Sequence, residues 1–405
     1  MSPSSLKIIN AKIITPSGVI DGGSLLAENG RIKTISNNLI GAEAAHTIDA
    51  GGKYLSPGFI DIHVHGGGGH DFMDNTTEAF LAIAQLHAKY GTTSLTPTTL
   101  SSEKADLLQT LETYQQANVQ NKNGAQFLGV HIEGPYFAMD QRGAQDPRFI
   151  RDPDPAEYRE IIEKFPDVKR WSAAPELKGA VEFGRYMTLK GVLPAIAHTE
   201  AVYDEVIEAF EAGFKHVTHL YSCTSTVTRR NAFRYAGVVE SAFLLDDMTV
   251  EIIADGTHLP PALLKLVYKL KGPNRIALIT DAMRAAGMPP GESILGGLKH
   301  GLKVIVEDNV AKLPDRSSFA GSVATADQLV RNMILLAGVP LTDAITMMTK
   351  TPAAIMKVDD RKGTLEENKD ADLVLFDEQI NIQYTIIGGN IVYCREQQEA
   401  IANKL

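Results

Sequence analysis

The sequence predicts an α/β protein: a closed (β/α)₈ barrel accompanied by a small β-rich module to which both chain ends contribute. Short apolar runs alternate with helical stretches eight times in the middle of the chain, which is typical of parallel strands joined by helical crossovers. Imidazole and carboxylate side chains stand at the ends of several runs, where such barrels carry their functional groups. The length of 405 residues suits a barrel of roughly 250–300 residues plus a smaller module. A doubly wound open sheet is the competing fold.

The two ends of the chain differ from the middle in their pattern of apolar and polar residues. Residues 1–56 alternate apolar and polar side chains in "LKIINAKIIT" and contain the hairpin signal "ENG" at 28–30. The segment "ADLVLFDEQINIQYTIIGGNIVY" at 371–393 has the same character. We therefore expect the first part of a β-rich module at 1–56, the barrel at 57–356, and the second part of the module at 357–405.

Eight candidate strands follow one another through the barrel segment. They are "FIDIHV" (59–64), "TSLTPT" (93–98), "FLGVHI" (127–132), "RWSAAP" (170–175), "VLPAIAH" (192–198), "KHVTHL" (215–220), "TVEIIAD" (249–255) and "IALITD" (276–281). Helical stretches separate them, for example at 77–91 and 201–213. In the second stretch, Val206 and Phe210 keep helical spacing and Gly213 supplies a C-terminal stop.

Composition and charge exclude several classes of protein. The net charge of −10 argues against nucleic acid as a partner. The two cysteines, Cys223 and Cys394, have no CxxC spacing and indicate a reducing compartment. No apolar run approaches the roughly 18–20 residues that cross a bilayer, and the N-terminus lacks the pattern of a signal peptide. We therefore expect a cytoplasmic protein without a membrane or nucleic-acid partner.

The first barrel strand carries an unusual pair of side chains. His63 and His65 lie two apart in "IDIHVHG", and alternate side chains of a strand share a face. Further imidazoles and carboxylates end other candidate strands: Glu133, His198, His219, Asp255 with His258 beyond it, and Asp281. Such donors without thiolates favour zinc, with iron, manganese and cobalt as alternatives. Histidines satisfied by hydrogen bonds are the other interpretation of the pair.

Other polar residues near these strand ends are expected to have structural roles. His131, which lies deeper in its strand, is expected in the core or behind the ligands. His216 is out of phase with His219 and is expected to face the helices. Glu200 is expected to be a charge at a helix N-terminus, with a second acid–base group as the alternative. Cys223 is expected to be a small loop residue.

Six motifs in a fixed order resemble one known family. "SPGFIDIHVHG", "HIEGPY", "AHTEA", "THLY", "IADGTH" and "TDAM" are together similar to the N-acetylglucosamine-6-phosphate deacetylase family of the amidohydrolase superfamily, over about residues 50–355. The resemblance implies the barrel with its β-sandwich and a homodimer. It also implies metal-dependent hydrolysis of the acetamide of N-acetylglucosamine 6-phosphate to glucosamine 6-phosphate and acetate in amino-sugar catabolism.

The resemblance also implies roles for individual residues. The principal metal ligands would be Glu133, His198 and His219, and a second metal position that some members fill would involve His63 and His65. One or two ions per chain are therefore expected, zinc foremost. Asp281 matches the catalytic aspartate, which takes a proton from water and passes it to the departing amine. His258 matches a histidine that contacts the sugar.

Three motifs on the substrate side depart from the family pattern. Gln145 in "RGAQ" stands where members usually have a histidine that orients the acetamide carbonyl; an amide still donates a hydrogen bond but carries no charge. Ser222 stands in "THLYSCT" where "THLYNAM" is usual. Arg229, Arg230 and Arg234 in "TRRNAFRYAG" are the candidates for binding phosphate, with a solvated basic loop as the alternative.

These departures leave other functions open. The substrate could be N-acetylgalactosamine 6-phosphate or an unphosphorylated N-acetyl amino sugar. A deaminase on the same scaffold would need a glutamate as proton shuttle, and Glu200 is the nearby candidate. A barrel used only for binding or assembly is the third class, against which Asp281 argues.

Overall fold

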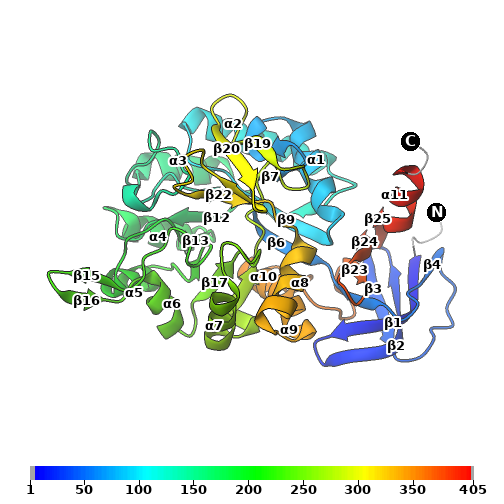
Figure 1. Ribbon diagram of the computed structural model, residues 1–405. Coiled ribbons are helices and arrows are strands. Elements are labelled where there is room, and N and C mark those ends of the chain that lie inside the picture. The colour runs from blue at the N-terminus through cyan, green and yellow to red at the C-terminus, as the bar shows by residue number, and fades with distance from the viewer. Residues whose placement is uncertain (1–4, 403–405) are drawn as a thin grey trace.

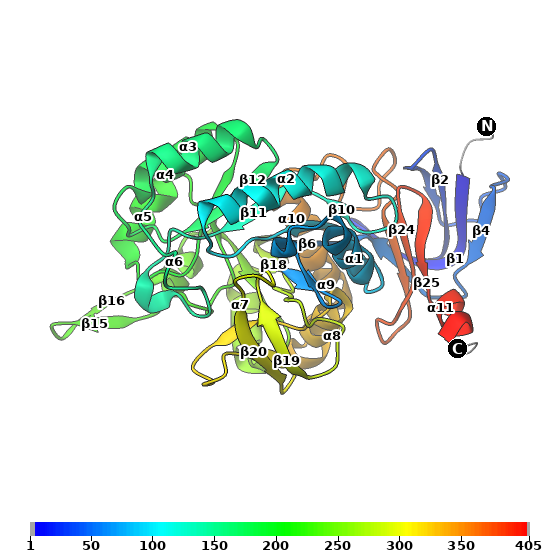
Figure 2. The ribbon, with the colours of Figure 1, turned by 90° about the horizontal axis from the view of Figure 1, so that it is seen from above.

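The computed structural model describes residues 5–402, which form a barrel beside a smaller β-sheet unit (Figures 1 and 2). The barrel strands are β6 (Phe59–Val64), β9 (Thr92–Pro97), β10 (Gln126–Phe127), β11 (Val130–Glu133), β12 (Val168–Ala173), β13 (Leu193–Ile196), β14 (His216–Val217), β17 (Thr249–Ile252) and β18 (Ile276–Leu278). They form two parallel sheets with the orders β10-β9-β6 and β11-β12-β13-β14-β17-β18. Bridges from Thr98 to His131 and from Val64 to Ala282 join these sheets at both edges. The wall therefore closes, and the predicted barrel is confirmed.

Most barrel strands end earlier than the sequence predicts. The sequence predicts β14 over 215–220, for example, but this strand comprises only His216–Val217. The residues that follow leave the ladder because their backbone turns: His198, His219 and Asp281 have φ angles of 46°, 28° and 49°. The residues beyond the shortened strands form the rim of the barrel.

Helices cover the outside of the wall (Figure 2). They are α1 (Thr77–Ala88), α2 (Lys104–Gln120), α3 (Pro155–Lys164), α4 (Ala180–Leu189), α5 (Tyr203–Glu211), α6 (Val238–Leu244), α7 (Pro261–Lys271), α8 (Ala326–Ala337), α9 (Leu341–Met348) and α10 (Lys350–Ile355), with short 3₁₀ turns η1 (Phe72–Asp74), η2 (Met139–Gln141) and η3 (Pro273–Arg275). Thr76 caps α1 through Oγ1, which accepts a hydrogen bond from the Ala79 amide at 3.2 Å. Apolar side chains fill the space between helices and wall, among them the fully buried Trp171 and Phe183.

Charged side chains occupy part of the barrel interior. Arg170 and Glu251 are both fully buried and form a bidentate ion pair, with Nη2 2.9 Å from Oε2. His216 Nε2 lies 3.2 Å from Glu251 Oε1, so the expectation that His216 faces the helices is wrong. Because the backbone turns left-handed at His219, strand alternation does not relate these two histidines.

Both chain ends contribute to one eight-stranded sheet (Figure 1). Its strands are β1 (Ser5–Thr15), β2 (Gly18–Glu28), β3 (Arg31–Ser36), β4 (His46–Asp49), β5 (Tyr54–Pro57), β23 (Leu373–Phe376), β24 (Ile382–Ile387) and β25 (Asn390–Cys394), followed by helix α11 (Arg395–Ala402). Antiparallel pairing of β5 with β23 joins the two ends. Leu6, Ile13, Leu55 and Leu373 lie in the core of this unit. The expected β module from both termini is confirmed.

Several elements beyond the eight-fold pattern are not predicted by the sequence. A hairpin of β15 (Thr228–Arg230) and β16 (Phe233–Tyr235) projects away from the barrel (Figure 2). A four-stranded antiparallel sheet follows β18 and consists of β19 (Gly291–Leu295), β20 (Leu302–Glu307), β21 (Val310–Lys312) and β22 (Phe319–Ser322). Two short strands, β7 (Gly66–Gly67) and β8 (His70–Asp71), pair after β6. Among residues 5–402, no helix is both long and apolar enough to span a bilayer.

A buried lysine links the barrel to the terminal sheet unit. Lys362 is 3% exposed, and its ammonium group contacts the carboxylate of Asp372 and lies 3.2 Å from that of Asp370. It also donates a hydrogen bond of 2.8 Å to Oε1 of Gln126 in β10. One side chain thus connects the barrel wall to the segment that enters β23.

Replacing this lysine should destabilise the protein strongly. Lys362→Met would leave the buried carboxylate of Asp372 without its cation, while Asp370 would keep Arg361, and breaking a buried ion pair in this way costs about 3–5 kcal/mol. Urea unfolding followed by circular dichroism measures the loss. The matched control is Lys104→Met, which removes an exposed pair with Glu160 and should cost at most about 1 kcal/mol. Equal effects of the two substitutions would contradict this role of Lys362.

Candidate metal centre

The C-terminal ends of the barrel strands bring the predicted ligand side chains together. His63 belongs to β6 and Glu133 ends β11. His65 follows β6, while His198 and His219 follow β13 and β14. We call these five residues the cluster. All five are buried, although more than 150 positions of the sequence separate the first from the last.

The carboxylate of Glu133 lies at the centre of the cluster. Its Oε1 is 2.9 Å from Nε2 of His219 and 3.4 Å from Nε2 of His198. Its Oε2 is 3.4 Å from Nε2 of His65, and Nε2 of His63 lies 3.6 Å from Oε1. Two groups of three potential ligands, with ligand atoms within 4.8 Å of one another in each group, therefore share Glu133.

The outer nitrogens of all four cluster histidines have hydrogen-bond acceptors. The Nδ1 atoms lie 3.4 Å from Glu251 Oε2 for His63, 3.3 Å from the Thr98 carbonyl for His65, 2.9 Å from the Gln141 carbonyl for His198 and 3.1 Å from the Ser222 carbonyl for His219. Because Nδ1–H can donate to these acceptors, each Nε2 faces the centre, where it can offer its lone pair to a cation that replaces its proton. The Nε2 atoms of His63 and His65 are only 3.2 Å apart. Facing lone pairs beside a carboxylate fit a divalent cation.

The backbone at the rim adopts conformations that are costly for ordinary residues. His198, His219 and Asp281 all have positive φ, and each such residue costs on the order of 1–3 kcal/mol. The strands β13, β14 and β18 end two or three residues before these positions. The left-handed turn directs each side chain inward just beyond the end of its strand, so the strain is localised at the cluster.

Asp281 lies at the edge of the cluster. Its Oδ1 is 3.2 Å from Nε2 of His65 and 3.4 Å from Nε2 of His63. Burial alone would raise the pKa of this carboxyl, but the nearby charge of His63 and the hydrogen bond from His65 hold the pKa below its usual value. Burial would likewise raise the pKa of Glu133, and its histidine neighbours hold that pKa well below its usual range. Both groups are therefore carboxylates.

Buried partners behind the cluster fix its geometry. Glu251, which contacts His63 Nδ1, is itself held by the guanidinium of Arg170. Burial would raise the pKa of the Glu251 carboxyl, but Arg170 keeps it well below its usual range. The Nε2 atom of His131 is hydrogen-bonded to Ser172 Oγ at 2.7 Å, and its ring lies edge-on to His63 at 4.7 Å between ring centres. His131 thus lies behind the ligands, as the sequence predicts.

Gln145 makes two specific hydrogen bonds beside the cluster. Its Nε2 donates to Glu133 Oε2 at 2.8 Å, and its Oε1 accepts from the Ser101 amide at 2.8 Å. The side chain is buried, with 5% exposure. Gln145 therefore holds the second oxygen of the central carboxylate and links it to the loop after β9.

A cavity of about 260 Å³ opens over the cluster. We call it the cluster cavity. It is lined by His65, Leu100, Glu133, Ala144, Gln145, His198, His219, Tyr221, Ser222, Cys223, His258, Asp281, Leu295, Ser318, Phe319 and Gly321. His258 is oriented by a 2.7 Å hydrogen bond from Nδ1 to Asp255, and its ring packs against that of Phe319. Tyr221 and the lining residues of β19 and β22 are not predicted by the sequence, because no motif marks an inserted sheet as part of a rim.

The predicted phosphate-binding arginines lie elsewhere. Arg229 and Arg230 are in β15 and Arg234 is in β16, and all three are exposed on the projecting hairpin (Figure 2). None of them lines the cluster cavity. Arg230 instead borders a separate surface hollow together with Glu200, so the glutamate considered for a deaminase also lies outside the cluster cavity.

Known proteins resemble the chain over almost all of its length. The model of the amidohydrolase family matches residues 54–392. The N-acetylglucosamine-6-phosphate deacetylase of Lysinibacillus sphaericus is 34% identical over 400 residues, which are 96% of this chain and 97% of that protein. The N-acetylgalactosamine-6-phosphate deacetylase of Escherichia coli O157:H7 is 32% identical over 381 residues, covering 94% and 97% of the two chains.

Solved structures show the same similarity in three dimensions. The N-acetyl-D-glucosamine-6-phosphate deacetylase of Mycobacterium smegmatis, in complex with N-acetyl-D-glucosamine-6-phosphate, is 29% identical and superposes with a TM-score of 0.87, covering 97% of this chain and 100% of that chain. The corresponding enzyme of Pasteurella multocida gives a TM-score of 0.88 at 27% identity, covering 96% and 99%. The chain is therefore an amide-hydrolysing enzyme that belongs to the N-acetylglucosamine-6-phosphate deacetylase branch of the amidohydrolase family.

Proposed function

We propose that this enzyme hydrolyses the acetamide of N-acetylglucosamine 6-phosphate to glucosamine 6-phosphate and acetate. The observation that carries the proposal is the convergence of four imidazole Nε2 atoms on the Glu133 carboxylate beneath a cavity, with the Asp281 carboxylate beside two of them. Glu133, His198 and His219 would hold one ion, and Glu133 with His63 and His65 a second. A divalent cation bound there, zinc foremost with iron, manganese or cobalt as alternatives, supplies Lewis acidity toward the amide carbonyl and acidifies water.

The other cavity residues have separable roles. Asp281, a carboxylate at the cavity wall, accepts a proton from the attacking water and passes it to the departing amine. His258, oriented through Asp255, offers Nε2 to a sugar hydroxyl, and the ring of Phe319 offers an apolar face to the sugar. Ser222 supplies a further polar contact. Gln145 has one amide hydrogen left after its bond to Glu133 and can donate it to the acetamide oxygen.

The phosphate is proposed to be bound by arginines of a second copy of the chain. No lysine or arginine is among the residues that line the cluster cavity in the described part of the chain. The hairpin with Arg229, Arg230 and Arg234 also exposes Phe233 at 71% and Val227 at 55%, and apolar exposure of this kind favours a protein contact. We therefore keep the homodimer as the proposed working form. We also keep the cytoplasm as its proposed location and the proposed division of the chain at 1–56, 57–356 and 357–405.

A deaminase finds less support. Glu200 is exposed and borders a different hollow, so it is not placed to shuttle a proton to a base in the cluster cavity. The 4-epimer N-acetylgalactosamine 6-phosphate is the stronger competing substrate, because a relative named for it matches nearly the whole chain.

Metal content should depend on the central carboxylate. Purified protein should hold one or two divalent ions per chain by elemental analysis, and chelation should abolish hydrolysis until metal is restored. Glu133→Ala removes a ligand shared by both groups, so it should lose most of the bound metal. The matched control Glu200→Ala changes a residue outside the cluster cavity, so this variant should keep its bound metal. Full activity in protein with far less than one ion per chain would refute this proposal.

Asp281→Asn should separate chemistry from binding. The amide cannot accept the proton of water, so kcat should fall by about 10²–10⁴-fold while KM and metal content change little. Steady-state kinetics and elemental analysis of the same preparation give both quantities. Asp140→Asn, an exposed position in η2, should behave like the wild type. A loss of metal that accounts for the lost activity would assign Asp281 to ligation instead.

A four-substrate panel tests the proposed substrate. The value of kcat/KM should be highest for N-acetylglucosamine 6-phosphate, lower for its galactosamine epimer, and lowest for the two dephosphorylated sugars. Gln substitutions of Arg229, Arg230 and Arg234 should each reduce the preference for phosphate, and Arg185→Gln on the exposed face of α4 should not. Equal losses on phosphorylated and unphosphorylated sugars would exclude these arginines, and ammonia release in place of acetate would establish a deaminase.

A further inference from the structure

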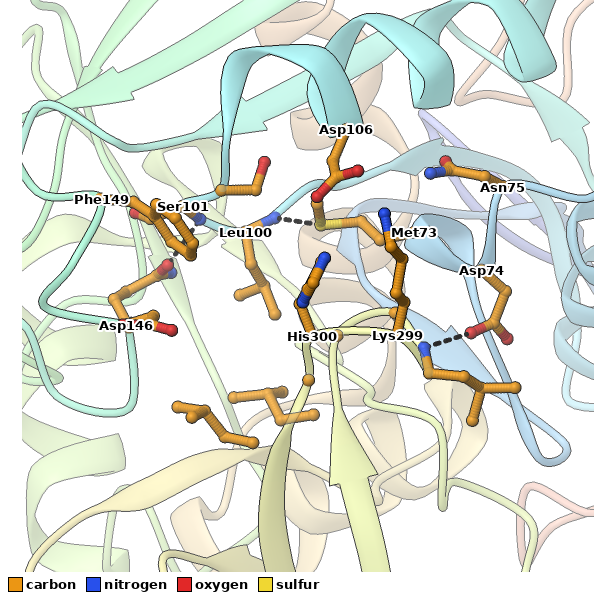
Figure 3. A pocket seen from close by; sticks show the side chains of 18 of the residues that line it. Met73, Asp74, Asn75, Leu100, Ser101, Asp106, Asp146, Phe149, Lys299 and His300 are labelled. Atoms are coloured by element: carbon orange, nitrogen blue, oxygen red, sulfur yellow. Dashed lines mark hydrogen bonds between the residues drawn. The ribbon is translucent and has the colours of Figure 1, made fainter.

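A second and larger cavity adjoins the cluster cavity. It has a volume of about 530 Å³, and we call it the chamber (Figure 3). Its walls come from η1, the first turns of α2, the loop at 144–149 and the turn between β19 and β20. The cluster cavity and the chamber have four lining residues in common, Leu100, Ala144, Gln145 and Leu295. We call these four residues the shared rim.

The chemistry of the cluster sets the direction in which a substrate lies. Asp281 must reach the departing amine, so the sugar lies on the side of Asp281. There the Asp281 carbonyl accepts a hydrogen bond from the Ser322 amide at 2.8 Å, and Phe319 of the same strand packs against His258. Gln145 holds Oε2 of Glu133 from the shared rim. The acyl half of the amide, opposite the sugar, therefore points toward the shared rim. This step rests on the proposed function.

The shared rim suits a hydrocarbon chain better than a sugar. Three of its residues, Leu100, Ala144 and Leu295, have only apolar side chains. The carboxamide of Gln145 is bonded to Glu133 and to the Ser101 amide, and in the proposed function its remaining hydrogen goes to the acyl oxygen. A hydroxyl group crossing the shared rim would lose water without gaining a full set of partners, which is costly. Methylene groups incur no such penalty.

The chamber beyond the shared rim has room for several methylene groups, and its walls mix apolar side chains with polar ones that include Asp106, Gln109 and Lys299. Met73, Phe149 and Leu302 contribute apolar surface. The carboxylate of Asp74 is paired with Arg284 at 2.5 Å, and that of Asp146 with Arg148 at 2.6 Å. Lys299 and His300 lie at the outer turn (Figure 3). The methyl group of an acetamide would leave nearly all of the chamber unused.

We propose that the chamber is a binding site for acyl chains and that the enzyme also removes longer straight-chain acyl groups from amino-sugar phosphates. The reaction is the same hydrolysis: the amide C–N bond breaks, the oxygen of water enters the released carboxylate, and its proton goes to the amine. The substrate class is thus N-acylglucosamine 6-phosphates from acetyl to hexanoyl. Each methylene transferred from water into the chamber strengthens binding by up to about fourfold.

A homologous series of substrates tests the proposal. The value of kcat/KM is measured for the N-acetyl, N-propionyl, N-butyryl and N-hexanoyl compounds, and we expect the longer chains to be within about tenfold of acetyl or better. Ala105→Trp fills the chamber from the exposed face of α2 without touching the cluster cavity. It should reduce kcat/KM at least tenfold for the hexanoyl compound and less than twofold for the acetyl compound. Ala156→Trp, at an exposed position of α3 away from both cavities, is the matched control.

Binding without turnover provides a second readout. Calorimetry with the Asp281→Asn enzyme should give dissociation constants that fall from acetyl to hexanoyl, and Leu298→Trp in the turn after β19 should remove this trend. Hydrolysis of the acetyl compound together with at least a thousandfold slower hydrolysis of the butyryl compound would overturn the chamber as an acyl site. Equal losses on all chain lengths in the Ala105→Trp enzyme would do the same. If the enzyme does not hydrolyse the acetyl compound itself, that result would instead overturn the proposed function.

Discussion

The arrangement of the cluster depends on one buried charge, the carboxylate of Glu133, which both groups of potential ligands share. One buried group lies between two pairs of imidazoles: its Oε1 faces His63, His198 and His219, and its Oε2 faces His65. A negative charge in such a place is stable only if the groups around it are positive or bind a cation. Three features of the surrounding structure meet that requirement. The barrel strands end at the ligands or a few residues before them, and the backbone of His198 and His219 is left-handed. Hydrogen-bond acceptors behind each imidazole ring determine which of its nitrogens faces the centre.

The barrel interior below the cluster shows the same logic at a second level. Arg170 and Glu251 are buried charges, and desolvating them is expensive unless each is fully paired. Glu251 is paired with Arg170 and also contacts His63 and His216. Asp61 similarly accepts a 2.6 Å hydrogen bond from Thr280, and burial raises the pKa of its carboxyl to about 7. Taken alone, these buried polar groups lower the stability of the protein. They nevertheless fix the orientation of His63, which belongs to the cluster.

Much of this arrangement can be predicted from the sequence because parallel strands present their C-terminal ends to a common rim. That rule alone brings His63, Glu133 and His219 together, and periodicity gives the strands and helices of the wall. The rule fails where the backbone leaves regular structure: alternation assigns His216 to the wrong face because its strand is only two residues long. The sheet of β19–β22 and the hydrogen-bond partners of Gln145 depend on contacts between distant loops, which spacing in the sequence does not encode. Composition likewise identifies the arginines of the projecting hairpin but not their position relative to the cavity.

The pairing of β5 with β23 has a consequence for how this protein is made. Strands β1–β5 leave the ribosome before β23, yet one edge of their sheet finds its partner only when β23 has been translated. At typical elongation rates that interval is roughly tens of seconds. During it, an apolar half-sheet with an open edge is exposed to neighbouring chains. Until β23 has been translated, the unpaired edge of β5 is therefore open to pairing with another chain.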